Sequence, residues 1–105
     1  MERVTLAEVP ASALAVLAER LQQVIRYGHT AAADDTAPAG HLTHVAHVLL
    51  LDATDIVRRH PDPRDLERAR RKTVQAAALC LAEIERIDRE LKTLADHLNQ
   101  GVPRP

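Results

Sequence analysis

Three histidines lie close together near the middle of the chain, at His41, His44 and His47. The three-residue step places His41 and His44 one helical turn apart, where two imidazoles can share a metal ion or another ligand. Asp34 and Asp35 precede them and could add a carboxylate. The alternative is that these histidines lie on a solvated helix face. The His-Glu-x-x-His spacing that would indicate a metalloprotease is absent from the sequence. We therefore expect these side chains at the edge of a ligand site.

A pair of aspartates, Asp52 and Asp55, lies one helical turn further along. Carboxylate and water oxygens are the ligands that Mg²⁺ prefers. The pair therefore predicts a magnesium site only if the protein is an enzyme. The alternative is that Arg58 or Arg59 neutralises both carboxylates on the surface.

Basic residues surround the predicted turn at 60–63 and form the strongest candidate for a ligand site. Arginine binds phosphate oxygens through two parallel hydrogen bonds, so arginines from both sides of a turn could hold a phosphorylated small molecule. The candidate cations are Arg58, Arg59, Arg64, Arg68, Arg71 and Lys72. The alternative is ion pairing with the acidic residues interspersed between 55 and 67. No glycine-rich phosphate loop and no nucleophile beside a base is present, so we predict no catalytic residue.

Apolar residues at three- and four-residue steps predict three helices, at about 10–27, 40–59 and 63–98, separated by a loop at 29–39. Gly28, Pro61 and the pair Asp62-Pro63 mark their ends. The predicted core faces are Leu14, Leu17, Leu21, Val24 and Ile25 in the first helix, and Leu42, Val45, Ala46, Leu49, Ala53, Ile56 and Val57 in the second. We expect an all-α three-helix bundle forming one domain over 1–105, with flexible ends at 1–9 and 99–105.

The third predicted helix carries a heptad pattern. Its apolar seam consists of Ala77, Ile84, Leu91 and Leu98 at one position and Cys80, Ile87 and Leu94 three residues later. A helix of about 35 residues is about 50 Å long, which exceeds the width of a compact domain of this size. Burying one bare leucine is worth about 1.5–3 kcal/mol. We therefore predict a homo-oligomer formed through this seam, unless the first helix folds back over it.

Composition limits the partners. The formal net charge is −1 and the only aromatic residue is Tyr27, so neither a general attraction for polyanions nor a base-stacking surface is present, and nucleic-acid binding is not expected. Cys80 is the single cysteine, which we expect to be buried. No apolar run reaches the roughly 18 residues of a membrane span and no secretory signal is evident, so we predict a cytoplasmic protein without a membrane partner.

Three segments resemble small helical proteins of tailed phages and prophages: 19–30, Asp34-Asp35, and 76–89 with its Ala-Glu-Ile-Glu-Arg-Ile-Asp-Arg motif. The resemblance covers about residues 14–90. Proteins of this kind look like distant relatives of the all-α MazG-type nucleotide pyrophosphohydrolases, which hold magnesium with helical carboxylates. Here Asp52-x-x-Asp55 and, at a different spacing from the family's, Glu83, Glu85 and Asp88 are the nearest substitutes for the carboxylate pairs of that family. Ala33 and His29 depart from the His-Asp-Asp and Gly-aromatic-Thr patterns of the phage proteins.

These departures disfavour catalysis more than ligand binding. We therefore expect a phage-type helical oligomer that binds a phosphorylated, nucleotide-like small molecule without turnover and without a cofactor. In a host cytoplasm it could sequester a nucleotide defence signal. Two alternatives stay open: a magnesium-dependent nucleoside triphosphate pyrophosphohydrolase, and a helical interaction module that inhibits a host protein.

Overall fold

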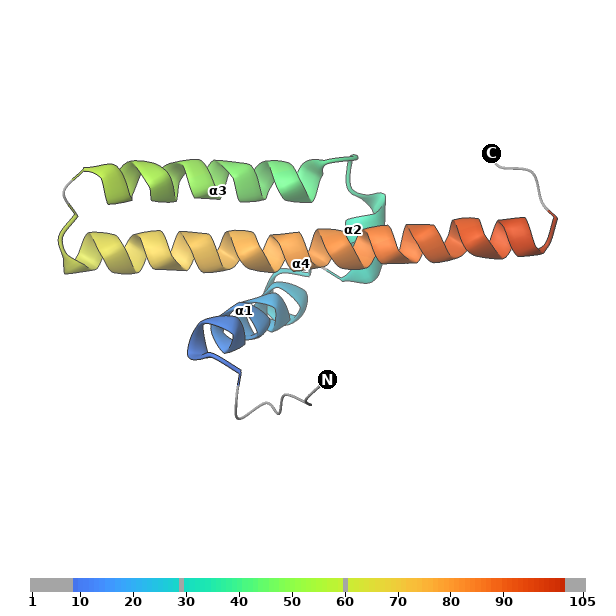
Figure 1. Ribbon diagram of the computed structural model, residues 1–105, viewed down its shortest axis with the longest axis horizontal. Helices are drawn as coiled ribbons and strands as arrows, with labels where there is room; N and C mark the ends of the chain where they lie inside the picture. The colour runs from blue at the N-terminus through green and yellow to red at the C-terminus, as the bar shows by residue number, and fades with distance from the viewer. Residues whose placement is uncertain (1–8, 29, 60, 102–105) are drawn as a thin grey trace.

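The computed structural model describes residues 9–28, 30–59 and 61–101, and these fold into helices without a strand (Figure 1). The helices are α1 (Ala11–Tyr27), α2 (Ala31–Thr36), α3 (His41–Arg58) and α4 (Pro63–Asn99). The all-α prediction is confirmed. None of these helices is both long and apolar enough to cross a bilayer. Most of the two ends predicted to be flexible, 1–9 and 99–105, lies outside the described residues.

Local signals set the ends of the three long helices close to their predicted positions. Gly28 takes the left-handed conformation that ends α1, with φ of 69°. At the start of α4, the Asp62 carboxylate accepts a hydrogen bond from the Asp65 N–H at 2.9 Å. The Asp65 carboxylate in turn accepts one from the Asp62 N–H at 3.2 Å. This reciprocal cap, followed by Pro63 in the first turn, fixes where the longest helix begins.

The predicted loop at 29–39 is wrong in its middle, because residues 31–36 form α2. Thr30 caps this short helix by accepting a hydrogen bond from the Ala33 N–H at 3.2 Å. Three consecutive alanines, the best helix formers, follow the cap. The fold therefore has one more helix than the three predicted.

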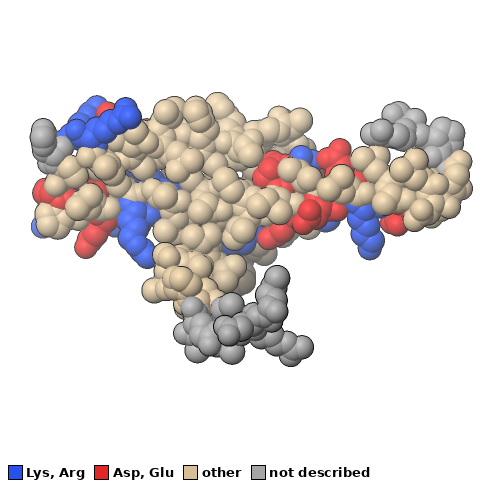
Figure 2. Space-filling view, in the orientation of Figure 1, with Lys and Arg blue, Asp and Glu red and all other residues tan. Residues whose placement is uncertain are grey.

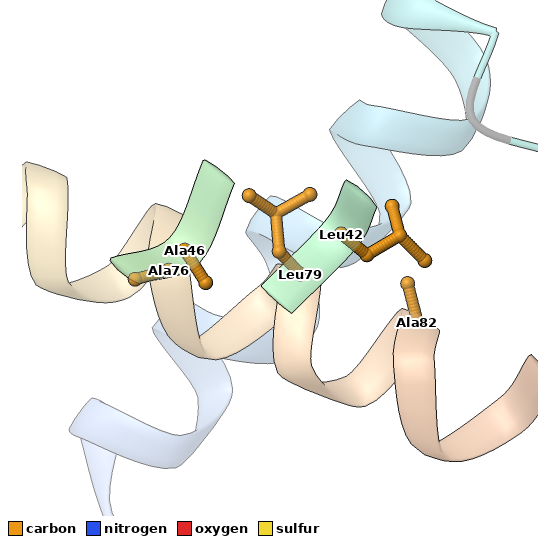
Figure 3. Packing of buried hydrophobic residues seen from close by; sticks show 5 residues of the cluster. All are labelled: Leu42, Ala46, Ala76, Leu79 and Ala82. Atoms are coloured by element: carbon orange, nitrogen blue, oxygen red, sulfur yellow. The ribbon is translucent and has the colours of Figure 1, made fainter. Parts of the chain in front are cut away.

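The core lies between α3 and α4, which run antiparallel side by side (Figure 1). In Figure 3, Leu42 and Ala46 of α3 lie over Ala76, Leu79 and Ala82 of α4. Among the described residues, most of the buried apolar side chains are alanines, and no large side chain is less than 2% exposed. The predicted face of the second helix is confirmed at most of its positions, although Val57 at its end is exposed. The core is thin, so burial within one chain contributes little stability.

Helix α1 crosses α4 on the side away from α3 (Figure 1), and it does not bury its predicted apolar face. Leu14, Leu17, Leu21 and Ile25 are 41–73% exposed, whereas Arg20 and Gln23 are buried. The prediction of this core face is wrong because α1 meets a part of α4 that offers ion-pair and hydrogen-bond partners. Arg20 and Gln23 face these partners, so α1 is turned about its own axis and its leucines lie beside the contact with α4.

Helix α4 is continuous over 37 residues and extends far beyond α3 (Figure 1). The predicted seam is uncovered there: Ile84, Ile87, Leu91 and Leu98 are 42–64% exposed. Helix α1 does not fold back over the seam, which was the alternative to oligomerisation. Cys80 is also exposed, so its predicted burial is wrong. Its helix face is apolar in sequence but lacks a covering element among the described residues.

Candidate functional site

Part of the predicted cationic set converges where α3 and α4 meet at the turn. Arg59, Arg68 and Lys72 line an open groove of about 280 Å³ together with Asp52 and Asp55. Arg59 contacts Asp55 at 2.6 Å and Lys72 contacts Asp52 at 3.4 Å. Arg68 lies 3.6 Å from Asp65, a weaker contact. This groove has nearly balanced charge, so the ion-pairing alternative describes these three cations better than a phosphate site does.

The other predicted cations lie elsewhere. Arg58 borders a different groove, with Leu50, Val57 and Thr73. Arg64 is exposed on the first turn of α4. Arg71 lies in a groove between α1 and α4. The six cations therefore do not form one pocket.

The histidines lie at the opposite end of α3 from the arginines. His41 and Arg58 begin and end this helix, and 17 residues at 1.5 Å each separate them by about 25 Å. His41 shares a groove of about 190 Å³ with Asp34 and Tyr27. From the sequence, we expected His41 to lie near the Asp34–Asp35 pair. His44 and His47 are exposed. Figure 2 shows Lys, Arg, Asp and Glu gathered around the turn between α3 and α4 and again along the protruding part of α4, with largely uncharged surface over α3 between these two regions.

The carboxylates that a magnesium enzyme would need do not converge. Asp52 contacts Lys72 on α4, and Glu83 and Asp88 follow at least 11 residues later on that helix, about 16 Å away along its axis. Asp34 and Asp35 contact Arg20 and Arg89 instead. Among the residues that the structure describes, no group of three or more acidic, histidine or cysteine side chains is arranged to hold a metal ion.

A buried ionic cluster joins α1, α2 and α4. The Arg20 guanidinium donates from Nη2 to Asp34 Oδ2 at 3.3 Å and to Glu85 Oε2 at 3.0 Å. The side chain of Asp34 is only 2% exposed and that of Arg20 only 11%. Gln23 lies one turn further along α1 and donates from Nε2 to the Gln75 carbonyl oxygen at 3.3 Å. This cluster decides how α1 sits on α4.

A second set of ion pairs extends the cluster along the protruding part of α4. Arg89 holds the Asp35 carboxylate through hydrogen bonds from Nε and Nη2, the shortest of them 2.8 Å. This hydrogen bonding lowers the pKa of Asp35 and raises that of Arg89. Arg86 donates to the largely buried Glu83 at 2.6 Å and to Glu90 at 2.9 Å, which raises the pKa of Arg86. These carboxylates are engaged as acceptors and are poorly placed to act as bases.

The groove between α1 and α4 has a different character. Its volume is about 370 Å³, within the usual range for small-molecule sites. Arg70 and Arg71 line it from α4, and Ala15, Ala18, Glu19, Gln22, Val74 and Gln75 complete the lining. Among the described residues, neither arginine forms an ion pair. Two adjacent guanidinium groups therefore border a surface with one carboxylate, amide groups and small apolar side chains.

Sequence reasoning missed Arg20, Gln23 and Arg70 as candidate residues. Residues 19–23, 34–35 and 83–89 lie in the three segments on which the phage resemblance was predicted, and the structure brings these segments together. Their common place in these segments was the one feature of the sequence that could have singled out Arg20 and Gln23. Periodicity could not have found them, because a charged residue on a helix is normally assigned to solvent. Nothing in the sequence distinguished Arg70 from its exposed neighbours.

No protein-family model, curated protein or solved structure matches this chain.

Proposed function

We propose that this protein binds a phosphorylated, nucleotide-like small molecule in the groove between α1 and α4, without converting it. The observation that carries the proposal is the pair Arg70 and Arg71, which border a groove of about 370 Å³ without an ion-pair partner among the described residues. Guanidinium groups match phosphate oxygens in geometry and charge. The groove at the turn, by contrast, already balances its cations with Asp52 and Asp55.

The remaining lining supports a ligand larger than phosphate alone. Ala15, Ala18 and Val74 provide a small apolar floor, against which a flat ring can lie. Gln22 and Gln75 offer both donors and acceptors, as a nucleobase or ribose edge requires. These groups bind and orient a ligand. A host nucleotide signal is the ligand class that the phage resemblance implies, and tight binding without turnover would sequester it.

Calorimetry with nucleoside mono-, di- and triphosphates and cyclic dinucleotides tests this proposal. One charge-assisted hydrogen bond contributes about 1.5–3 kcal/mol. Replacing Arg70 and Arg71 together by glutamine should therefore weaken binding at least about tenfold. The matched control replaces Arg59 and Arg68 by glutamine, since these cations already have carboxylate partners. Its dissociation constant should stay that of the wild type.

Two results would contradict the proposal. One is the absence of heat with every ligand of the panel. The other is loss of binding in the Arg59 and Arg68 control with retained binding in the Arg70 and Arg71 variant, which would place the ligand at the turn. Circular dichroism of both variants checks that the helices are intact.

A second candidate function is assembly, and the uncovered seam of α4 favours it. Ile84, Ile87, Leu91 and Leu98 are exposed on the part of α4 that extends past the end of α3 (Figure 1). We propose that a second copy of the chain covers this seam, giving a homo-oligomer. Light scattering tests the proposal, and a monomer at submillimolar concentration would contradict it. A pulldown that finds one stoichiometric host protein on the seam would favour the inhibitory interaction module instead.

The magnesium pyrophosphohydrolase is the alternative with the least support, since Asp52 of α3 contacts Lys72, which lies about 16 Å along α4 from Glu83. Pyrophosphate release from common triphosphates in the presence of magnesium would restore it.

A further inference from the structure

The groove between α1 and α4 carries opposite charges on its two walls. Arg70 and Arg71 line it from α4, and Glu19 lines it from α1. Over residues 9–28, 30–59 and 61–101, no ion pair joins Glu19 to either arginine. The three side chains border one cavity of about 370 Å³, so a ligand that fills it meets charges of both signs.

Glu19 is positioned by the contacts that α1 makes with α4. It precedes the buried Arg20, which donates to Glu85, and it lies one helical turn before Gln23. Gln23 donates to the carbonyl oxygen of Gln75, and Gln75 itself lines the groove. The backbone that carries the partly buried Glu19 is therefore fixed beside the cavity. A group held in this way can discriminate between ligands, because binding does not have to order it first.

The phosphate end of a nucleotide belongs at the two arginines. Arg70 and Arg71 are exposed, and Val74 and Gln75 follow one turn, about 6 Å, further along α4. A carboxylate repels a phosphate and an arginine attracts it, so the phosphate binds on the α4 wall. Glu19 then faces the remainder of the ligand, which is the base.

A carboxylate distinguishes the nucleobases by the hydrogen-bond donors on their edges. It accepts hydrogen bonds and donates none, so it favours an edge with adjacent N–H groups. Guanine offers N1–H beside its 2-amino group. Adenine and cytosine place a ring-nitrogen acceptor beside their amino group, and uracil has its N–H between two carbonyl oxygens. Each of these three bases turns an acceptor towards the carboxylate, so Glu19 matches guanine best.

We propose that the groove between α1 and α4 selects guanine mononucleotides. Glu19 accepts hydrogen bonds from N1–H and the 2-amino group of the base, while Arg70 and Arg71 bind the phosphate. This selection rests on the proposed nucleotide binding and names the base. The cavity volume lies near the lower end of the roughly 300–1,000 Å³ of small-molecule sites, which suits a single nucleotide. Ala15 and Ala18, on the same wall as Glu19, leave space for the purine ring.

Calorimetry of the wild-type chain with the 5′-monophosphates of guanosine, inosine and adenosine tests the selection. The three nucleotides share the same sugar and phosphate. Inosine monophosphate lacks only the 2-amino group, and adenosine monophosphate lacks the N1–H as well. A site that hydrogen-bonds an N–H group rejects an analogue without it, because the group on the protein is left unpaired. Guanosine monophosphate should bind at least about tenfold more tightly than adenosine monophosphate, with inosine monophosphate between them.

The variant Glu19→Gln should remove the preference. Its amide can donate to N1 of adenine and accept from the adenine amino group, whereas its NH₂ group meets one of the two guanine donors. The preference for guanosine over adenosine monophosphate should therefore fall at least about tenfold. The matched control is Glu67→Gln, which removes the same charge from an exposed position of α4 outside the groove. Its affinities for both nucleotides should equal those of the wild type.

The outcomes separate the choice of base from the proposed function. Equal affinities for guanosine and adenosine monophosphate in the wild type, or a preference that Glu19→Gln leaves unchanged, would overturn the guanine assignment. Nucleotide binding in the groove would still stand if replacing Arg70 and Arg71 weakened both ligands. Binding of none of the three monophosphates would overturn the selection, and the absence of heat with the wider panel would overturn the proposed function as well.

Discussion

Arg20 of α1 and Asp34 of α2 form an ion pair of 3.3 Å in which the carboxylate is almost fully buried. Glu85 of α4 accepts from the same guanidinium nitrogen at 3.0 Å but is half exposed. One arginine therefore ties together three helices. The placement of α1 on α4 therefore depends on these ion pairs, whereas the placement of α3 on α4 depends on apolar packing.

Replacing Asp34 by alanine should destabilise the fold by about 3 kcal/mol. Breaking a buried ion pair leaves an uncompensated charge that costs about 3–5 kcal/mol, and the retained contact with Glu85 places the effect at the lower end. Urea unfolding followed by circular dichroism measures it. The matched control is Asp35→Ala, because Asp35 is the neighbouring residue and its ion pair with Arg89 is exposed. Equal losses in the two variants would show that burial of the Arg20 pair contributes nothing.

The Asp35–Arg89 pair should give a contribution to stability that depends on pH. Hydrogen bonding from Arg89 lowers the folded-state pKa of Asp35 below the usual 3.8. The stabilisation is therefore present above the unfolded-state pKa and is lost as the pH falls through the lower folded-state value. The unfolding free energies of the wild type and of Asp35→Asn should differ at neutral pH and converge as the pH falls through the lowered folded-state pKa of Asp35. A difference that grows on acidification would contradict the assignment.

Gln23 should tolerate replacement by methionine. Its side chain is buried, but its Oε1 atom has no hydrogen-bond partner, and its only bond reaches the Gln75 carbonyl at 3.3 Å. An apolar side chain of similar size removes an unsatisfied acceptor as well as that long bond, so the two effects offset each other. We expect the free energy of unfolding to change by less than about 1 kcal/mol in a urea titration. A loss above about 2 kcal/mol would mean that a bound water or another group satisfies Oε1.

The melting temperature of the wild type should rise with chain concentration if the seam is an interface, because association stabilises the folded state by mass action. Leu91→Asp should abolish this dependence. Val57→Asp is the control, since Val57 lies on α3 outside the seam and has similar exposure, 52% against 58% for Leu91. Calorimetric scans across a concentration series measure the effect. A dependence that survives in Leu91→Asp and disappears in Val57→Asp would place the interface on α3.

The sequence predicted the three long helices well because their ends depend on adjacent residues. Gly28 and the Asp62 cap act within one turn and need no tertiary contact. Helix α2 was not predicted, although it also depends on adjacent residues. The sequence contains the Thr30 cap and three alanines, but the neighbouring residues typical of loops led to the prediction of a loop. The rotation of α1 was not predictable in this way. Hydrophobic periodicity assumes that the apolar stripe faces the core, and here Arg20 and Gln23 reverse that choice.

The candidate site was predicted only in part for a related reason. Residues close in sequence around the turn do come together, as Arg59, Arg68 and Lys72 show. Arg59 and Arg68 are neutralised within one helical turn, by Asp55 and Asp65, and of the three cations Lys72 alone pairs across the helices, with Asp52. The groove beside Arg70 and Arg71 exists only because α1 crosses α4 there, a tertiary relation that no local pattern encodes.

The alanines between α3 and α4 have a consequence for how this protein tolerates mutation. Ala46, Ala76 and Ala82 are at most 2% exposed, so they set how closely the two helix axes approach. They have almost no side chain to lose, and trimming this contact leaves hardly any cavity. Adding even one branched carbon forces the axes apart along their whole length. The protein is therefore sensitive to gain of side-chain volume where most domains are sensitive to its loss, since every substitution of these alanines except glycine enlarges the side chain.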